Sequence, residues 1–141
     1  MTEVFYKAQK NIGQPALLNL YNDAGWFVYT RKPEQLIQAI RQSLFVYTAW
    51  ENKKLVGLIR VVGDGLTIIY IQDVLVLKSH KRRGIGRKLM EKVLEEYKPV
   101  RQKVLLTDDT PETRGFYESL GFRSCDDGKI MAFIHAPTPT P

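Results

Sequence analysis

Apolar residues recur every three or four positions in four segments of the chain, which predicts four amphipathic helices. Pro15 and Pro33 favour the first turn of the two leading helices, because proline lacks an amide hydrogen that the first turn would leave unbonded. Thr110 is a candidate N-cap ahead of Pro111 in the last helix, and Gly121 favours the left-handed turn that ends it. The predicted helices cover residues 15–24, 33–44, 85–97 and 111–120.

Several shorter segments are rich in β-branched and aromatic residues, and short turns separate the first three of them. This pattern predicts an antiparallel meander between the second and third helices. The segment 66–77 is almost entirely apolar, so we expect both of its faces to be covered at the centre of the sheet. The predicted fold class is α/β, with a mixed, mainly antiparallel central sheet flanked by helices on both faces. The predicted strands are 44–50, 54–62, 66–77, 103–107, 122–124 and 129–135.

The length of 141 residues and the hydrophobic share of 44% are enough for one buried core. We expect a single domain over residues 1–135 and an extended, solvated tail over the proline-rich residues 136–141. No apolar run approaches the roughly 20 residues that span a bilayer, and the N-terminus lacks the pattern of a signal peptide. These features predict a cytoplasmic protein with no membrane partner. Cys125 is the only cysteine and the two histidines lie far apart, so we expect neither a disulfide nor a metal site.

Positive charge is concentrated in one part of the chain. The net charge is +6, and 10 of the 21 lysines and arginines lie between Lys78 and Lys103. Five of them crowd around two glycines in the segment KRRGIGRKLM, which joins the apolar segment 66–77 to the third helix. Glycines let a ligand approach the backbone closely, and the unpaired amides of a helix start favour phosphate oxygens. This junction is a candidate pyrophosphate site, and the alternative is an exposed basic turn.

Two motifs in combination, VLVLKSHKRRGIGRKLM and, further along the chain, RGFYESLGF, resemble the GCN5-related N-acetyltransferase (GNAT) family. The family's cofactor motif is Gln/Arg-x-x-Gly-x-Gly/Ala, and here Lys81 takes the first position, so charge is kept while the planar fork of arginine is lost. The resemblance implies that acetyl-CoA is the cosubstrate and that the central strands splay apart to bind it. The residues that it assigns to the pyrophosphate are Arg82, Arg83, Gly84, Ile85, Gly86 and Arg87. The strand edge that it assigns to the pantetheine arm is Val74, Leu75 and Val76.

The resemblance also implies a general acid. Tyr117 in FYESLGF stands where the family commonly places the tyrosine that protonates the coenzyme A sulfur; without the resemblance it would be interpreted as a core tyrosine. The general base stays open. Asp73 is the nearest carboxylate, but a structural anchor is the favoured interpretation, and strand alternation places it opposite Gln72. Gln72 stands where some members have a glutamate, and the remaining alternatives are water held by Gln72 or by backbone carbonyls, or no base at all. Thr110 stands where an asparagine commonly contacts the cofactor, and a plain helix cap is its alternative.

The expected acceptor is an amine, carried by a small molecule or by a protein. The connection between the first two helices is unusually aromatic, so Tyr21, Trp26 and Tyr29 are candidate walls of an acceptor pocket, with Asp23 as a partner for a cationic amine. The alternative is that the aromatic residues cover the sheet and that Asp23 is solvated.

The resulting hypothesis is an acetyl-CoA-dependent N-acetyltransferase in which the amine attacks directly within a ternary complex. A basic nucleic-acid-binding module ranks below it, because no recognition-helix pattern accompanies the charge, and we expect no nucleic-acid partner. A non-catalytic acyl-CoA sensor is the other alternative. Homodimerisation through sheet edges is common in the family, and the sequence leaves the oligomeric state open.

Overall fold

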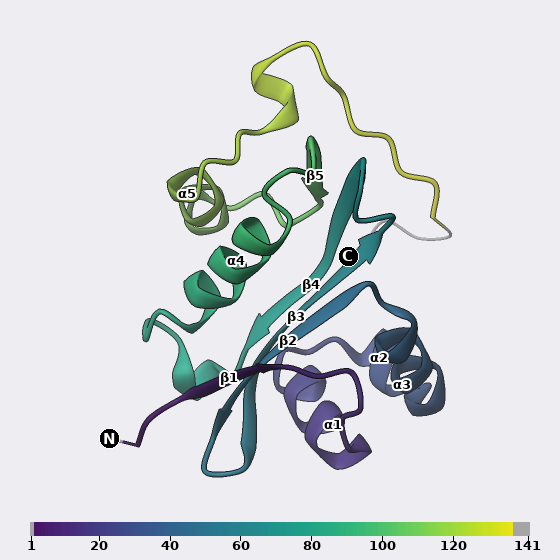
Figure 1. Ribbon diagram of the computed structural model, residues 1–141, viewed down its shortest axis with the longest axis vertical. Helices are drawn as coiled ribbons and strands as arrows, with labels where there is room; N and C mark the ends of the chain where they lie inside the picture. The colour runs from purple at the N-terminus through teal and green to yellow at the C-terminus, as the bar shows by residue number, and fades with distance from the viewer. Residues whose placement is uncertain (1, 137–141) are drawn as a thin grey trace. The chain divides into compact units, whose positions relative to one another are not determined.

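A five-stranded sheet forms the centre of residues 2–105 in the computed structural model, which describes residues 2–136 (Figure 1). The strands are β1 (Phe5–Ala8), β2 (Phe45–Glu51), β3 (Lys54–Gly63), β4 (Ile68–Val76) and β5 (Gln102–Leu105). They lie in the order β1-β2-β3-β4-β5, with antiparallel pairing among the first four and parallel pairing between β4 and β5. This arrangement confirms the predicted mixed, mainly antiparallel sheet.

Helices cover both faces of this sheet (Figure 1). On one face lie α1 (Gln14–Asp23), α2 (Phe27–Thr30) and α3 (Pro33–Gln42), and on the other lies α4 (Ile85–Glu96). The close approach of α4 to β3 depends on Gly57, because a Cβ on that residue would lie 2.9 Å from Cγ2 of Ile85. The sequence predicts α1, α3 and α4 near these bounds but treats the residues of α2 as a linker.

The most buried strand of the sheet is β3. All residues from Leu55 to Val61 are buried, whereas buried and partly exposed residues alternate along β4. The sequence predicts that both faces of the segment 66–77 are covered. In the structure, the strand with both faces covered is β3 instead. The reason is that β3 is the middle strand of the sheet, with α1 packed on one of its faces and α4 on the other.

Strand β4 is paired on both sides over only part of its length. β5 pairs with Ile68–Ile71, whereas Asp73–Val76 have a registered partner in β3 alone. The two strands therefore part after Ile71, as expected for splayed central strands (Figure 1).

The pairing of β3 with β4 also contains a bulge. Arg60 lies opposite Asp73, but Val61 lies opposite Ile71, so Gln72 is an extra residue in β4. A bulge interrupts the strict alternation of side chains between the two faces of a strand.

Residues 106–136 form a second compact unit that contains α5 (Pro111–Ser119) and a short 3-10 turn at Cys125–Asp127. The prediction of a last strand pair over 122–124 and 129–135 is wrong, since residues 106–136 contain no strand. Four apolar side chains of the segment 129–135 are instead exposed by 66% to 87%. A strand needs a neighbour for its backbone hydrogen bonds, which β-type composition alone does not supply. The exposed side chains are Ile130, Met131, Phe133 and Ile134.

Two expectations concern the extent of the chain. The tail predicted over 136–141 falls, beyond Ala136, outside the described residues. One domain over residues 1–135 stays a prediction. Within residues 2–136, helices are too short or too polar to cross a bilayer.

Candidate active site

The junction between β4 and α4 has an unusual backbone. It passes through a 3-10 turn (Lys78–His80), and Gly84 then caps α4 with a φ of 79°. A Cβ on Gly84 would meet no atom of the described residues within 4 Å, so this glycine is required by its left-handed φ rather than by space. Arg82 is also left-handed, with a φ of 65°. A non-glycine residue adopts that conformation at a cost of roughly 1 to 3 kcal/mol, and such strain occurs often at ligand sites.

Glu51 at the end of β2 holds this junction. Its Oε1 lies 2.8 Å from Nε2 of His80, and its Oε2 accepts a hydrogen bond from Nη2 of Arg83 at 3.0 Å. The hydrogen bonds from His80 and Arg83 lower the pKa of Glu51 to about 2. We call these three residues the Glu51 clamp. Because the clamp engages the Arg83 side chain, the backbone of Arg83 is the part left for the predicted phosphate contact.

The other residues predicted to bind pyrophosphate lie around the start of α4. Arg82 and Arg87 are exposed, and Gly86 is partly exposed in the first helical turn. Arg87 also lies one turn from Glu91, with 3.9 Å between Nη1 and Oε2. Ile85 differs from them because its side chain is 2% exposed and belongs to the core. The structure thus brings two exposed cations and the amides of a helix start together.

The three residues of the predicted pantetheine edge differ in the direction of their backbone. The N–H of Leu77 donates to the carbonyl of Val56 at 2.9 Å. Because antiparallel pairing alternates, the backbone of Leu75 faces β3, whereas that of Val74 and Val76 faces the side from which β5 has parted. Val74 and Val76 therefore offer backbone groups to a ligand.

On the other face of the sheet, Asp73 anchors a buried cluster. The residue is 2% exposed. Its Oδ2 accepts hydrogen bonds from Nε of Arg60 at 2.7 Å and from the hydroxyl of Tyr21 at 2.9 Å, and its Oδ1 accepts one from Tyr29 at 3.0 Å. Burial raises the pKa of both tyrosines, so both remain donors at neutral pH. We call these four residues the Asp73 cluster, and in it Asp73 is a structural anchor.

Gln72 reaches the same cluster. Its Nε2 donates to the hydroxyl of Tyr29 at 3.0 Å, and that hydroxyl donates to Asp73. The prediction that Gln72 and Asp73 lie on opposite faces of the strand is therefore wrong. The bulge is the reason, since the extra residue interrupts alternation at this point.

The residues predicted to wall an acceptor pocket have different environments. Tyr21 is completely buried. Oδ2 of Asp23 accepts the backbone N–H of Lys78 at 2.8 Å, so this carboxylate holds the turn after β4. Trp26 packs against both tyrosines, with ring centroids 5.9 Å from Tyr21 and 6.1 Å from Tyr29.

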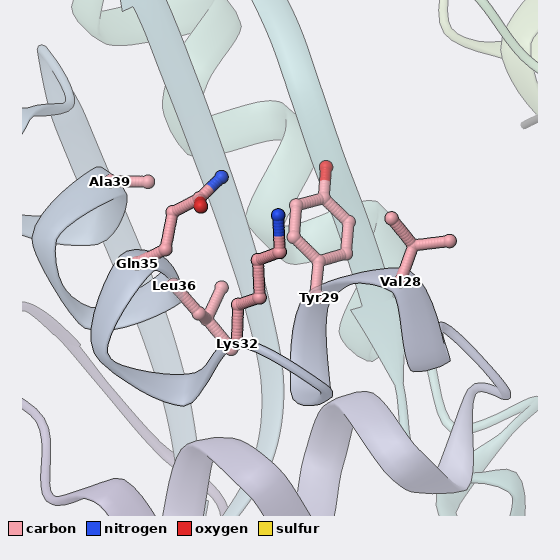
Figure 2. A pocket seen from close by; sticks show the side chains of 6 residues that line it. All are labelled: Val28, Tyr29, Lys32, Gln35, Leu36 and Ala39. Atoms are coloured by element: carbon pink, nitrogen blue, oxygen red, sulfur yellow. The ribbon is translucent and has the colours of Figure 1, made fainter. Parts of the chain in front are cut away.

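Tyr29 is the predicted wall residue that lines a groove. The groove has a volume of about 110 Å³ and lies between α2 and α3. Figure 2 shows the Tyr29 ring beside the Lys32 side chain, with the hydroxyl directed away from α2. The lining residues are Val28, Tyr29, Lys32, Gln35, Leu36 and Ala39.

Tyr117 lies in α5, in the second unit. Its ring makes edge contacts with Phe116 and Phe122 at centroid distances of 5.0 and 5.8 Å. Burial raises the pKa of Tyr117 above its ordinary value of 10.0, so the hydroxyl is protonated at neutral pH. At the start of α5, Thr110 accepts the N–H of Thr113 at 3.1 Å, which confirms the predicted helix cap.

Comparison with known proteins decides the family. Residues 14–136 match the family model for the acetyltransferase (GNAT) domain, which is most of the chain. The chain belongs to the GNAT family of acetyltransferases. Acetyl transfer is the general chemistry of GNAT proteins, and acetyl-CoA is their usual acetyl donor.

Solved GNAT structures have the same fold. A GNAT-family acetyltransferase of Streptococcus pneumoniae aligns with a TM-score of 0.85 and 36% identity, over 95% of this chain and 98% of that chain. An aminoglycoside acetyltransferase from an uncultured soil metagenomic sample aligns with a TM-score of 0.69 over 99% of both chains. Its 20% identity makes this a likeness of fold alone.

A curated GNAT relative matches a shorter stretch. The chloroplastic GCN5-related N-acetyltransferase 1 of Arabidopsis thaliana is 34% identical over 85 residues, which are 60% of this chain and 43% of that protein. A second relative, a Gibberella zeae acetyltransferase, is 36% identical over 62% of this chain and 51% of its own length. This GNAT chain thus spans about half the length of the curated relatives it matches.

Sequence reasoning missed three residues of this GNAT site: Arg60, Glu51 and His80. Each contacts a residue far along the chain, as Glu51 does with Arg83, 32 positions away. For Arg60 a signal exists, because a lone arginine in the apolar run LVGLIRVV predicts a buried charge that requires a partner. Nothing in the neighbouring sequence marks Glu51 as the residue that holds the junction.

Proposed function

We propose that this GNAT protein is an acetyl-CoA-dependent N-acetyltransferase that acetylates a primary amine by direct attack in a ternary complex. One observation carries the proposal: the first unit combines a capped helix start at Gly84 with an outward-facing strand edge at Val74 and Val76. A helix start suits a pyrophosphate, and a strand edge suits an extended arm that contains amide groups. Coenzyme A has both of these parts.

The residues present fit the cofactor. α4 is 12 residues long, so its N-terminal amides and dipole favour phosphate oxygens, and exposed Arg82 and Arg87 add positive charge there. Arg83, Gly84, Ile85 and Gly86 would contribute their backbone. When bound, acetyl-CoA supplies the acetyl group as a thioester.

The proposed proton donor is the hydroxyl of Tyr117. A departing thiolate needs a proton, and a tyrosine whose pKa is raised by burial keeps its proton at neutral pH. Within residues 106–136 this hydroxyl has no hydrogen-bond partner, so its proton is not engaged inside its own unit. The family position of Tyr117 also supports this role.

The proton of the amine needs a different acceptor from Asp73. The Asp73 carboxylate is buried and already accepts hydrogen bonds from Arg60, Tyr21 and Tyr29, so both of its oxygens are engaged. We propose that water takes the amine proton. Cys125 lies in an exposed turn of the second unit, and the proposal includes no acetyl-enzyme.

A thiol-release assay tests the function. Purified protein is incubated with acetyl-CoA and with an arylalkylamine, an aminoglycoside, a peptide with a free N-terminus and an Nα-blocked lysine. At least one amine should release coenzyme A thiol at a rate that saturates with both substrates. Thermal stabilisation by acetyl-CoA without turnover of any amine would contradict catalysis and favour a sensor.

Replacing Tyr117 by phenylalanine tests the general acid. Tyr117→Phe should lower kcat by roughly 10² to 10⁴ and leave the affinity for acetyl-CoA nearly unchanged, because the lost interaction belongs to the transition state. The measurements are kcat, the Kd of acetyl-CoA and the unfolding midpoint. A near-native kcat together with a lower midpoint would show that Tyr117 is a core residue only.

A further inference from the structure

A chain of hydrogen bonds leads from the buried core to the surface at Gln72. It begins with the Arg60 guanidinium, which donates from Nε to Oδ2 of Asp73 at 2.7 Å. In every hydrogen bond that it makes within residues 2–105, the Asp73 carboxylate is the acceptor. Oδ1 of Asp73 lies 3.0 Å from the hydroxyl of Tyr29, so the proton of that bond is the tyrosine's own.

The next link fixes the orientation of an amide. A tyrosine hydroxyl has one proton, and Tyr29 uses it on Asp73. Toward Gln72, Tyr29 can therefore only accept. The Gln72 side chain must then present its NH₂ group, and its Nε2 lies 3.0 Å from the hydroxyl. The buried ion pair thus decides which end of an exposed amide faces inward.

The other end of that amide is left as a hydrogen-bond acceptor. Gln72 is exposed, and within residues 2–105 its Oε1 receives no hydrogen bond. Gln72 is also the bulged residue at which β4 and β5 have parted, two positions before the outward-facing backbone of Val74. A fixed acceptor atom therefore lies beside the strand edge that the proposed function assigns to the cofactor arm.

We propose that Oε1 of Gln72 accepts a hydrogen bond from the amine substrate and that Tyr29 is the residue that positions it. This inference rests on the proposed function and goes further, because it assigns an amine contact and the device that orients it. The neutrality of the amide matters for the chemistry. An amide cannot take the amine proton as a carboxylate can, so this contact orients the N–H group and leaves the proton to the proposed water. An amide binds the N–H group without raising the amine's pKa.

Three single substitutions test the inference. Gln72→Met removes the acceptor at similar length and should raise the KM of the amine about tenfold. Tyr29→Phe frees the amide to rotate and should raise that KM about threefold, because an ordered contact loses its preorganisation. Tyr21→Phe is the matched control: it also removes a phenol that donates to Asp73 but does not contact Gln72, so the amine KM should stay unchanged. None of the three should change the KM of acetyl-CoA.

The double variant separates positioning from simple loss of stability. In the Gln72→Met background, Tyr29→Phe should have no further effect on the amine KM, because no amide remains to be oriented. Additive effects would overturn the role of Tyr29. An unchanged amine KM in Gln72→Met, measured with the amine that the wild-type protein acetylates fastest, would overturn the contact while leaving the proposed function intact.

A spectroscopic measurement tests the orientation independently of turnover. In ¹⁵N-labelled protein, the side-chain NH₂ signals of Gln72, assigned by their loss in Gln72→Met, should shift in Tyr29→Phe and stay in place in Tyr21→Phe. Signals that do not respond to Tyr29→Phe would overturn the fixed amide. Absence of turnover with every amine would refute the proposed function and the amine contact together, whatever the signals show.

Discussion

The junction before α4 and the Asp73 cluster lie on the same unit but are held together differently. The junction is a run of adjacent residues whose form comes from the backbone, with left-handed φ values at Arg82 and Gly84. The cluster consists of side chains from α1, α2, β3 and β4, and Tyr21 and Asp73 are 52 positions apart. Apart from the Glu51 clamp, the junction is exposed and depends on local contacts, whereas the Asp73 cluster is buried and depends on long-range contacts.

This difference determines how each region should respond to substitution. A side chain added to the exposed junction changes what can bind there without removing core contacts. A charge removed from the buried cluster leaves its partner charge without compensation, which destabilises the whole unit. The following experiments would break or sharpen this contrast.

The largest effect is expected for Asp73→Asn. The substitution keeps the shape of the side chain but leaves the Arg60 guanidinium, in a residue that is 7% exposed, without its counter-charge. The free energy of unfolding should fall by about 3 to 5 kcal/mol, as urea denaturation would measure. Arg60→Met combined with Asp73→Asn should recover part of that loss. A loss below about 1 kcal/mol for Asp73→Asn would contradict the role of the cluster as an anchor.

The next effect concerns ligand binding at the junction. Acetyl-CoA at a hundredfold excess over Kd should stabilise the wild-type protein by about 2.7 kcal/mol, and Gly86→Glu should remove this stabilisation. The reason is that a carboxylate at the helix start repels phosphate, whereas the same charge is favourable for the free helix. Thermal unfolding of each protein with and without acetyl-CoA measures this stabilisation. Gly86→Gln is the control: it has similar bulk without the charge, so it should keep part of the stabilisation. Undiminished binding of acetyl-CoA by Gly86→Glu would show that the phosphates bind elsewhere.

A smaller effect is expected from the Glu51 clamp. Glu51→Gln weakens the link to His80 and Arg83, so the junction should be less preorganised and the Kd of acetyl-CoA should rise roughly three- to tenfold. Isothermal titration calorimetry would measure the change. Tighter binding would instead show that the Arg83 side chain, once released, contacts phosphate itself.

The smallest effect is a pH dependence. The pKa of Glu51 is lowered to about 2 in the folded protein from an ordinary 4.5. The clamp should therefore contribute its full stability above about pH 4.5 and lose it as the pH falls toward 2. The difference in unfolding free energy between the wild-type protein and Glu51→Gln should shrink over this window. A difference that does not change with pH would show that the clamp charge does not stabilise the fold.

Local signals made much of the fold predictable. Pro15, Pro33 and Pro111 mark helix starts that the structure contains, and the glycines of the junction predict a turn into α4. These features depend on neighbours in the sequence and on the conformations that proline and glycine allow. The part of the site that binds through its backbone therefore lies within the range of sequence reasoning.

The features that were not predicted depend on contacts across the fold. The bulge at Gln72 arises from the register of β3 against β4, which no local pattern in β4 reveals. The structural role of Arg60 becomes clear only once Asp73 is known to be its ion-pair partner. Phe27–Thr30 form α2 although the segment has no helical repeat long enough to read. The apolar run at 129–135 has the composition of a strand without forming one, because pairing is a property of two segments.

The incomplete pairing of β4 has a consequence for solubility. Unpaired backbone at the margin of a sheet invites other chains to add a strand, and proteins commonly protect such margins. Here the stretch Gln72–Val76, which has no partner on the β5 side, belongs to a strand that stands between two neighbours in the strand order. A foreign strand carries side chains on both faces, so it needs more room beside β4 than an extended ligand without side chains does. Under the proposed function this edge binds the extended cofactor arm, and the neighbouring β5 limits its use as a template for aggregation.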